Sequence, residues 1–393
     1  MRAAVIRSCV LICALMCAML CGCGGSSGNG NTMTGGTPPA APTISTTTNV
    51  QTGVQNGAVI VSLSDTTANV QIFYTVDGST PTSSSQQYQA PFLVASNLTV
   101  NAIAISGASD PLEVSTVASQ TFTPNIPSGT LVWSDEFTNT TGAPAQPNPL
   151  IWTYDTGGGG WGNQELETYC GWGSNTSPCS TANPSEYVGA TDGYLHIVAQ
   201  QPSASVYTSA RLKTQGFFSF QYGRIEFAAS VPEAQGFWPA NWLLGNNIAT
   251  VSWPACGEMD VLERVDAATT PDNNQGSIHG TGFTGGTGLG TQYQFPSGQT
   301  AATFHYYGMI WSPGSVSYYV SDTPNPANPN LYATYTPASL TPLNDGAIWP
   351  FDTGQANFII LNLAVGGSYP GSPNSNTPFP SEMLVDYVRI YTN

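Results

Sequence analysis

Apolar and polar residues alternate along two stretches in the first third of the chain. Residues 70–75 (VQIFYT) and 98–104 (LTVNAIA) place an apolar side chain at every second position. A period of two predicts strands that bury one face. Asp77-Gly78, between the two stretches, is a strong signal for a tight turn. We therefore predict a small all-β module over residues 43–124.

Strand-like runs recur along the rest of the chain, over residues 130–393. The most regular are GRIEFAASV (223–231), NFIILNLAVGG (357–367) and MLVDYVRIY (383–391). Turn-forming residues separate these runs, and no long amphipathic helix pattern accompanies them. This arrangement is typical of a β-sandwich of two curved sheets, whose concave face could hold an extended ligand.

Composition agrees with an all-β chain and narrows the class of partner. The 393 residues include 42 Gly and 30 Pro, and 11% of the residues are aromatic. Only 8% are charged, and this composition argues against helix bundles and coiled coils, which are rich in Ala, Leu, Glu, Lys and Arg. The formal net charge is −16 with only seven Lys and Arg, which argues against a nucleic acid or an anionic membrane surface as a partner, because phosphate binding needs clustered cations. We expect a monomer, because no long exposed apolar helix is predicted.

The N-terminus has the pattern of an export signal. Arg2 and Arg7 precede an apolar run over residues 9–21, which is too short to span a bilayer and fits a signal-peptide core. The run ends in Leu-Cys-Gly-Cys, which resembles a bacterial lipobox; this implies a lipoprotein signal over residues 1–23 and lipidation of Cys23. An ordinary secretory signal is the alternative, with the same export and no anchor. Residues 24–42 are rich in Gly, Ser, Thr and Pro and predict a flexible linker. We expect an outer-membrane or cell-surface lipoprotein, otherwise a secreted protein, which would contact the membrane only through its lipid anchor.

Four of the eight cysteines lie in the apolar run of residues 9–21, Cys23 follows that run, and the other three lie in the larger unit. Because export implies an oxidising compartment, Cys170 and Cys179 are candidates for a disulfide, with two free thiols as the alternative. Cys256 would remain unpaired and is interpreted as a small buried residue rather than a nucleophile. The cysteines lack CxxC spacing and His partners, so they do not indicate a zinc site.

Three carboxylates lie within six residues in the segment WPACGEMDVLERVD (253–266). On a regular strand Glu258 and Asp260 share one face while Glu263 points to the other. One extra residue between Asp260 and Glu263, a β-bulge, would bring all three to one face. The interleaved apolar residues indicate that the opposite face is buried, and Trp253 stands upstream as a candidate sugar platform. A solvated acidic strand edge is the alternative interpretation.

A bulged strand of this kind suits a retaining glycosidase. The outer α-carbons would lie about 13 Å apart. Two Glu side chains leaning toward each other could close that gap to the ~5–5.5 Å of a nucleophile and its acid/base partner. Three like charges in one groove also push the pKa values apart, so that one carboxyl stays protonated as an acid and another ionises as a nucleophile.

The segment WPACGEMDVLE (253–263) resembles the catalytic signature of glycoside hydrolase family 16, in its laminarinase-like branch. Further segments resemble that family in its order: LVWSDEF (131–137), GGWGNQELETY (159–169), TSARLKTQG (208–216), YGRIEF (222–227), GFWPANWLL (236–244), FHYYGMIW (304–311), NLAVGG (362–367) and VDYVRIY (385–391). The resemblance implies a concanavalin-like jelly-roll sandwich over residues 130–393. It also implies that Glu258 is the nucleophile, that Glu263 is the general acid and base, and that Asp260 orients the nucleophile.

The same resemblance implies a set of substrate-binding residues. Asn163 and Arg211 would donate hydrogen bonds to sugar hydroxyls, and His279 would lie near the leaving group. Sugar platforms would be Trp238, Trp242 and Trp253, because an indole face suits the C–H patches of a sugar ring. Core packing is the alternative for each Trp, a fold salt bridge for Arg211 and a surface loop for His279. His196 and His305 are interpreted as strand residues without chemistry.

Three further features lie outside the predicted set of catalytic and substrate-binding residues. By resemblance, Glu136, Gly193 and Asp386 are a candidate structural calcium site away from the chemistry, since carbonyl and carboxylate oxygens suit that cation. Asn241 occupies a position where the family has an aromatic residue, so we expect an altered subsite. The segment IFYTVDGSTPT (72–82) resembles the immunoglobulin-like C-terminal module of chitobiase-type hexosaminidases. It carries no catalytic constellation, so we interpret it as a spacer, with carbohydrate binding as the alternative.

Together these features predict an endo-acting, retaining hydrolase of β-1,3 or mixed β-1,3/1,4 glucans such as laminarin. No cofactor is needed for this chemistry. A sulfated galactan would require a row of cations along the groove, and the seven Lys and Arg of the chain can hardly supply one. This favours a neutral polysaccharide as the substrate, with agar as a weaker possibility. A transglycosylase shares the same covalent intermediate and remains open. A non-catalytic carbohydrate-binding protein on the same fold is the other alternative, although it would be expected to lack one of the three carboxylates.

Overall fold

The structure is a computed structural model, which describes residues 37–106, 113–265, 272–343 and 346–393. The predicted signal peptide, Cys23 and linker residues 24–36 lie outside these ranges. No helix among the described residues is long and apolar enough to cross a membrane. The described chain is almost entirely strand and turn, as expected.

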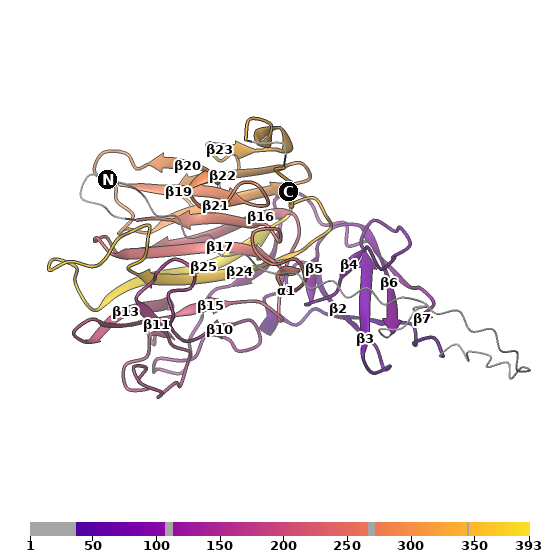
Figure 1. Ribbon diagram of the computed structural model, residues 1–393, viewed down its shortest axis with the longest axis horizontal. Coiled ribbons are helices and arrows are strands. Elements are labelled where there is room, and N and C mark those ends of the chain that lie inside the picture. The colour runs from indigo at the N-terminus through magenta and orange to yellow at the C-terminus, as the bar shows by residue number, and fades with distance from the viewer. Residues whose placement is uncertain (1–36, 107–112, 266–271, 344–345) are drawn as a thin grey trace, which may run out of the picture. The chain divides into compact units, whose positions relative to one another are not determined.

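The module of residues 43–124 is built from two small sheets (Figure 1). The three-stranded sheet has the order β1 (Thr43–Thr47), β2 (Val59–Ser64), β5 (Phe92–Val94). The five-stranded sheet has the order β4 (Gln86–Gln87), β3 (Val70–Thr75), β6 (Leu98–Ser106), β7 (Glu113–Val114), with β8 (Ala118–Phe122) also paired to β6. The two strands predicted from alternation are therefore β3 and β6, and they pair antiparallel. Val61, Val94 and Val100 are buried in the core of the module.

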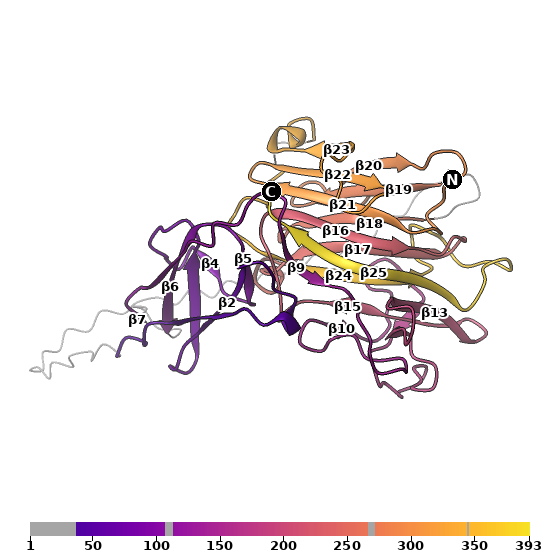
Figure 2. The same cartoon turned by 180° about the vertical axis from the view of Figure 1, so that it is seen from behind.

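The larger unit contains two sheets, which can be followed from behind in Figure 2. The seven-stranded sheet has the order β10 (Thr153–Asp155), β15 (Arg211–Lys213), β24 (Asn357–Val365), β17 (Phe237–Gly245), β18 (Glu258–Glu263), β19 (Asn273–His279), β20 (Leu289–Gln294). The ten-stranded sheet has the order β11 (Glu167–Tyr169), β14 (Val206–Ser209), β13 (Leu195–Ser203), β25 (Ser381–Tyr391), β16 (Gly223–Ser230), β21 (His305–Ser312), β22 (Ser315–Ser321), β23 (Leu331–Tyr335), with β12 (Glu186–Val188) paired to β13 and β9 (Leu131–Asp135) paired to β25.

Helices are short in the described ranges. They are α1 (Ile248–Val251) and the 3₁₀ turns Val50–Thr52, Gly285–Thr287 and Pro337–Leu340. The three runs singled out in the sequence are β16, β24 and β25. Every residue of β24 is buried, as expected for a strand near the centre of a covered sheet.

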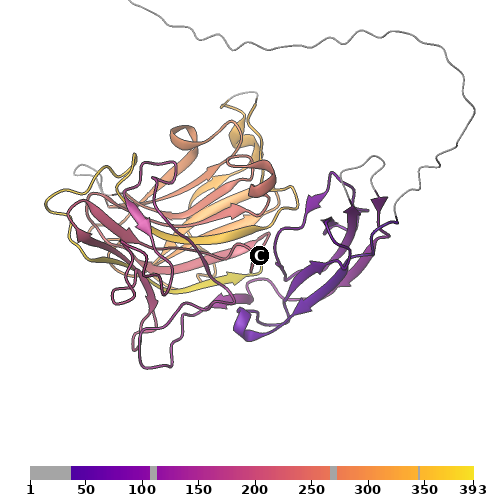
Figure 3. The same cartoon turned by 60° about the horizontal axis from the view of Figure 1, so that its bottom comes forward.

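The main core lies between the two sheets of the larger unit, whose layers are visible in Figure 3. Met259 and Leu243 contribute to it from the seven-stranded sheet, and Phe227 and Met309 contribute from the ten-stranded sheet. The opposite face of the seven-stranded sheet carries the polar side chains of the candidate site. Packing against the second sheet therefore fixes which face of each strand is free to carry chemistry.

Strand β17 shows this division and corrects one expectation. Trp238 and Trp242 are partly exposed on one face, whereas Leu243 is fully buried on the other. Asn241 has the same parity as Leu243 and is also fully buried, and neither polar atom of its amide has a hydrogen-bond partner among the described residues. The expectation that Asn241 alters a subsite is therefore wrong, because its side chain lies on the core face of the strand.

Candidate active site

Strand β18 contains the bulge that the sequence predicted. Across the pair with β17, Leu262 lies opposite Asn241 and Asp260 lies opposite Trp242. Two consecutive residues of β17 therefore face residues two apart on β18, and Val261 is the extra residue. A bulge shifts the following side chains to the other face of the strand. Glu263 accordingly joins Glu258 and Asp260 on the face away from the core.

Hydrogen bonds from β19 show that the three carboxylates share this face. The hydroxyl of Ser277 lies 3.3 Å from Oε2 of Glu263, and Ser277 is the register partner of Asp260. His279 is the register partner of Glu258. Strand β19 therefore supplies neighbours to all three carboxylates from alternate residues, which share one face of the strand.

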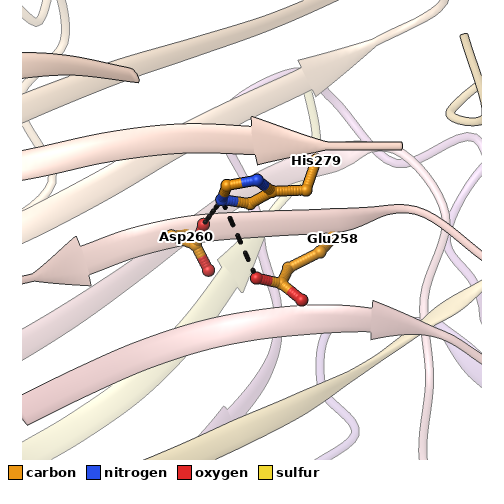
Figure 4. A group of neighbouring side chains, drawn as sticks. All are labelled: Glu258, Asp260 and His279. Carbon is orange, nitrogen blue, oxygen red and sulfur yellow. Dashed lines mark ion pairs between the residues drawn. The ribbon is translucent and has the colours of Figure 1, made fainter. Parts of the chain in front are cut away.

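His279 lies between the first two carboxylates, as Figure 4 shows. Its Nε2 is 3.2 Å from Oδ2 of Asp260 and 3.9 Å from Oε1 of Glu258. The exposed indole of Trp253 donates from Nε1 to Oε2 of Glu258 over 2.7 Å. The nucleophile candidate is thus held on both sides, by a ring that can carry charge and by a neutral N–H donor.

Glu263 is held by neutral donors. Trp238 donates from Nε1 to its Oε1 over 3.1 Å, while Gln275 Nε2 lies 3.4 Å from its Oε2. The hydroxyl of Tyr369 donates to Gln275 Oε1 over 3.2 Å, and its ring packs edge-on against Trp238. These hydrogen bonds orient the carboxyl and lower its pKa, so burial and the neighbouring Asp260, rather than the donors, keep a proton on Glu263.

Burial raises the pKa of every member of the trio. The pKa of Glu258 rises to about 8, with Asp260 as the second cause, and the pKa values of Asp260 and Glu263 rise to about 7. Asp260 also raises the pKa of Glu263, whereas His279 lowers it. Three carboxyls this close cannot all be ionised near neutral pH, so the cluster retains protons there. A proton donor and an ionised carboxylate can therefore exist together in one groove.

Arg211 lies over two indole rings, one of which belongs to Trp242, the register partner of Asp260. Its guanidinium carbon lies 5.3 Å from the ring centroid of Trp161 and 4.8 Å from that of Trp242. Nε of Arg211 pairs with Asp155 over 3.0 Å, and Lys213 pairs with the same carboxylate. The charge of Arg211 is thus balanced by an acid while its guanidinium lies over the rings of two indoles.

A hydrogen-bonded chain connects Asn163 to Trp242 on strand β17. Asn163 donates to Glu165 over 3.0 Å, and the hydroxyl of Tyr169 donates to the same carboxylate over 2.9 Å. Asn362 donates to Tyr169 and accepts 2.8 Å from the indole of Trp242. Asn163 and Trp242, two residues predicted to bind substrate, therefore belong to one network.

Sequence reasoning did not single out several members of the site. Gln275, Ser277 and Tyr369 contact Glu263 or its partners, while Glu165 and Asn362 hold the network around Trp242. Two signals were available. Polar residues alternate through NNQGSIH (273–279), and Glu165 and Asn362 stand inside segments already quoted for their family resemblance. Nothing in the sequence alone relates these segments to the carboxylates, because they are far apart along the chain.

The remaining predicted residues lie outside the groove network. Cys170 and Cys179 form a disulfide, and Cys256 is a buried free thiol whose pKa burial raises to about 12. Both carboxylate oxygens of Glu136 accept from the guanidinium of Arg389. Asp386 is partly buried, and burial raises its pKa.

Comparisons with known proteins assign both parts of the chain. Residues 50–116 match the model of the chitobiase/beta-hexosaminidase C-terminal domain, and residues 179–357 match the model of glycosyl hydrolases family 16. A beta-glucanase of Rhodothermus marinus is 36% identical over 269 residues, which cover 66% of this chain and 84% of the relative.

Solved structures agree with this assignment. The catalytic domain of an endo-1,3-beta-glucanase (laminarinase) from Thermotoga petrophila RKU-1 is 36% identical with a TM-score of 0.56, covering 67% of this chain and 98% of that one. The laminarinase of Rhodothermus marinus is also 36% identical, with a TM-score of 0.54 and coverage of 67% and 96%. The jelly-roll sandwich and the N-terminal immunoglobulin-like module are thereby confirmed. The chain belongs to glycosyl hydrolase family 16 and is a glycoside hydrolase.

Proposed function

We propose that this enzyme hydrolyses internal β-1,3 bonds of laminarin-like glucans, or of mixed β-1,3/1,4 glucans, with retention of configuration. The observation that carries the proposal is the bulge at Val261, which gathers Glu258, Asp260 and Glu263 on one groove face. Relatives named as a beta-glucanase and as laminarinases support the choice of glucan.

The reaction proceeds by double displacement. Glu263 gives its proton to the glycosidic oxygen while a carboxylate oxygen of Glu258 attacks the anomeric carbon, so the C–O bond to the leaving sugar breaks and a glycosyl ester forms. Water then attacks the same carbon, its proton passes to Glu263, and the ester bond to Glu258 breaks. Because one carboxyl serves as acid and then as base, no further base is required.

Asp260 and His279 prepare the nucleophile. Asp260 raises the pKa of Glu258 and His279 lowers it, so their contact couples the charge of the nucleophile to the imidazole between them. We assign Asp260 and His279 as positioning residues that set the ionisation and orientation of Glu258. The indole of Trp253 favours the ionised form, since it donates to Oε2.

Substrate binding is assigned to the aromatic and amide groups around the trio. The exposed ring of Trp253 and the partly exposed rings of Trp238 and Trp242 would stack on sugar faces. Asn163 and the terminal nitrogens of Arg211 would donate to hydroxyls. Arg211, which lies over the ring of Trp242, and Lys213 on the same strand both pair with Asp155, which suits an uncharged substrate.

Export, anchoring and metal binding belong to the same proposal. We retain export through the signal of residues 1–23, lipidation at Cys23 and a monomeric state as expectations. At the candidate calcium site the Glu136 side chain is engaged by Arg389, so Glu136 and Gly193 would bind through backbone carbonyls. The carboxyl of Asp386 would be the charged ligand, and its donor type fits a hard cation. Such an ion would stabilise the fold and would take no part in catalysis.

The proposal is tested by incubating the purified enzyme with laminarin, lichenan, agarose and carrageenan. Product lengths are read by mass spectrometry and the anomeric configuration by proton NMR during the first turnovers. We expect short β-anomeric oligosaccharides from laminarin, a smaller yield from lichenan and none from the galactans. Release of α-anomeric products, or cleavage of a galactan alone, would contradict the proposal.

A further inference from the structure

One nitrogen of the His279 ring faces two carboxylates at once (Figure 4). Nε2 lies 3.2 Å from Oδ2 of Asp260 and 3.9 Å from Oε1 of Glu258, and one ligand atom from each residue lies within 4.8 Å of the others. Two ligands bound tetrahedrally to a zinc ion at about 2.1 Å are separated by about 3.4 Å. The first distance fits such an ion, and the second needs a shift of only about 0.5 Å. The three side chains therefore have the spacing of a metal site.

Two polar atoms of this group are buried without a partner. Oδ2 of Asp260 and Nδ1 of His279 have no hydrogen-bond partner among the described residues, and Asp260 is only 5% exposed. A buried carboxylate oxygen without a donor is costly, and a cation beside it would supply the missing contact. A proton on Nδ1 leaves the lone pair of Nε2 free to coordinate that cation.

The other two histidines of the chain lack this arrangement, and the structure describes all three. His196 also contacts two carboxylates, but one lies at its Nε2 and the other at its Nδ1. The two nitrogens of an imidazole point away from each other, so those carboxylates cannot join the ring around one ion. His305 pairs with a single carboxylate, and its other nitrogen contacts threonine oxygens. His279 is thus the histidine with the geometry of a metal ligand.

The ring of His279 is fixed by its packing against Gly288. A β-carbon added to Gly288 would overlap the ring at Cε1 and Nδ1, so the ring lies directly on the glycine backbone. The side chains of His279 and Glu258 are both partly exposed, which gives a small ion access from solvent. The site is therefore formed before any ion binds.

The donor set selects the class of ion. Ca²⁺ and Mg²⁺ prefer sites made wholly of oxygen, whereas an imidazole nitrogen combined with carboxylate oxygens suits Zn²⁺. We propose that Glu258, Asp260 and His279 bind a zinc ion, which reversibly inhibits the enzyme.

Inhibition follows from the position of the ion on the reacting carboxylate. Zinc would withdraw electron density from the carboxylate of Glu258, which must attack the anomeric carbon. Its charge would also oppose the positive charge that develops on the sugar ring in the transition state. This inhibitory effect rests on the proposed function, because it takes Glu258 as the nucleophile, whereas zinc binding rests on the geometry alone.

Calorimetric titration of the purified enzyme with zinc chloride tests the binding. Calcium chloride in the buffer keeps the candidate calcium site filled. We expect one zinc ion to bind per chain, and hydrolysis of laminarin should fall in proportion to zinc occupancy and recover when a zinc-selective chelator is added. Magnesium chloride at the same concentration should leave hydrolysis unchanged.

Two variants and a matched control locate the ion. His279→Gln removes the nitrogen ligand and should weaken zinc binding by at least about 100-fold, whereas Gly288→Ala only displaces the ring and should weaken it about tenfold. Gly288 has a φ of −60°, which alanine adopts readily. The control is His196→Gln, because His196 contacts Asp192 and Glu382 through different nitrogens. It should change neither zinc affinity nor inhibition.

Unchanged zinc affinity in His279→Gln, or no binding by the wild type, would overturn the inference. Full hydrolysis of laminarin at saturating zinc would overturn it as well. If the wild-type enzyme leaves laminarin intact without zinc, the proposed function fails, yet calorimetry on the variants still decides the zinc site. Inhibition is then measured on whichever glycan the enzyme cleaves.

Discussion

Two buried acidic regions of the larger unit differ in what surrounds them. Glu186, on β12, is fully buried, and neither of its carboxylate oxygens has a hydrogen-bond partner among the described residues. Burial alone raises its pKa to about 9. Glu258 and Glu263 also have raised pKa values, yet each accepts an indole hydrogen bond and contacts further polar groups from β19.

The difference shows that a raised pKa does not by itself mark a catalytic group. Glu186 is a carboxyl kept neutral by its surroundings, without donors to orient it and without contact with solvent. The trio on β18 combines burial with oriented donors and side-chain exposures of 17% at Glu258 and 13% at His279, which leave room for a ligand. Oriented hydrogen-bond donors and access to solvent therefore distinguish the carboxyls of β18 from a carboxyl that is only buried.

The largest effect is expected from neutralising the reacting pair. Glu258→Gln and Glu263→Gln should each lower kcat/KM on laminarin by at least about 10³-fold, because one loses the nucleophile and the other the acid. With a 4-nitrophenyl glycoside, Glu263→Gln should still release a burst of nitrophenol and Glu258→Gln should not. Thermal unfolding checks that both variants remain folded. Near wild-type turnover by either variant would refute the role assignment.

A smaller loss of activity is expected from replacing Trp238, whose indole donates a hydrogen bond to Glu263. Trp238→Phe removes the donor to Oε1 of Glu263, and we expect kcat/KM to fall about tenfold. Indole donation favours the ionised carboxyl, so its loss should raise the pKa of Glu263 and move the basic limb of the pH profile of kcat/KM to higher pH.

The matched control for this variant is Trp349→Phe, which removes an indole donor from Asp352, a carboxylate outside the trio. It should leave the basic limb unchanged. A shift of equal size in both variants, or a shift to lower pH in Trp238→Phe, would show that the indole does not set the ionisation of Glu263.

The variant with the smallest effect on activity is Glu186→Gln, which should act on stability alone. The folded pKa of Glu186 is raised from 4.5 to about 9, so its contribution to stability is present below the unfolded pKa and is lost as pH rises toward 9. Glu186→Gln should therefore stabilise the protein increasingly between pH 5 and pH 9, by at most about 1.4 kcal/mol per pH unit.

Chemical denaturation at several pH values measures this gain, with kcat/KM on laminarin expected to stay constant. The control is Glu113→Gln, at a partly exposed carboxyl of β7. Equal stability of the Glu186→Gln variant and the wild type at pH 9 would mean that Glu186 ionises freely in the folded protein. A loss of kcat/KM would show that Glu186 contributes to catalysis and is not only a buried carboxyl.

The sequence alone determined the strands and the chemistry of β18. A period of two assigns each side chain to a face of its own strand, which is why β3, β6 and the carboxylate strand could be predicted. It also showed that Glu263 needs a bulge to join its partners, and the register at Val261 confirms that bulge. These are local properties, fixed by neighbours within a few residues.

Only the tertiary structure decided which strands lie side by side. Tyr369 contacts Gln275 across a separation of 94 residues, and Asn362 contacts Tyr169 across 193. The same limit explains the error at Asn241, whose face is set by packing against the second sheet rather than by its neighbours in WPANW. Local alternation assigns a side chain to one face of its strand or the other. The order of strands in the sheet and the position of the core decide which residues that side chain contacts.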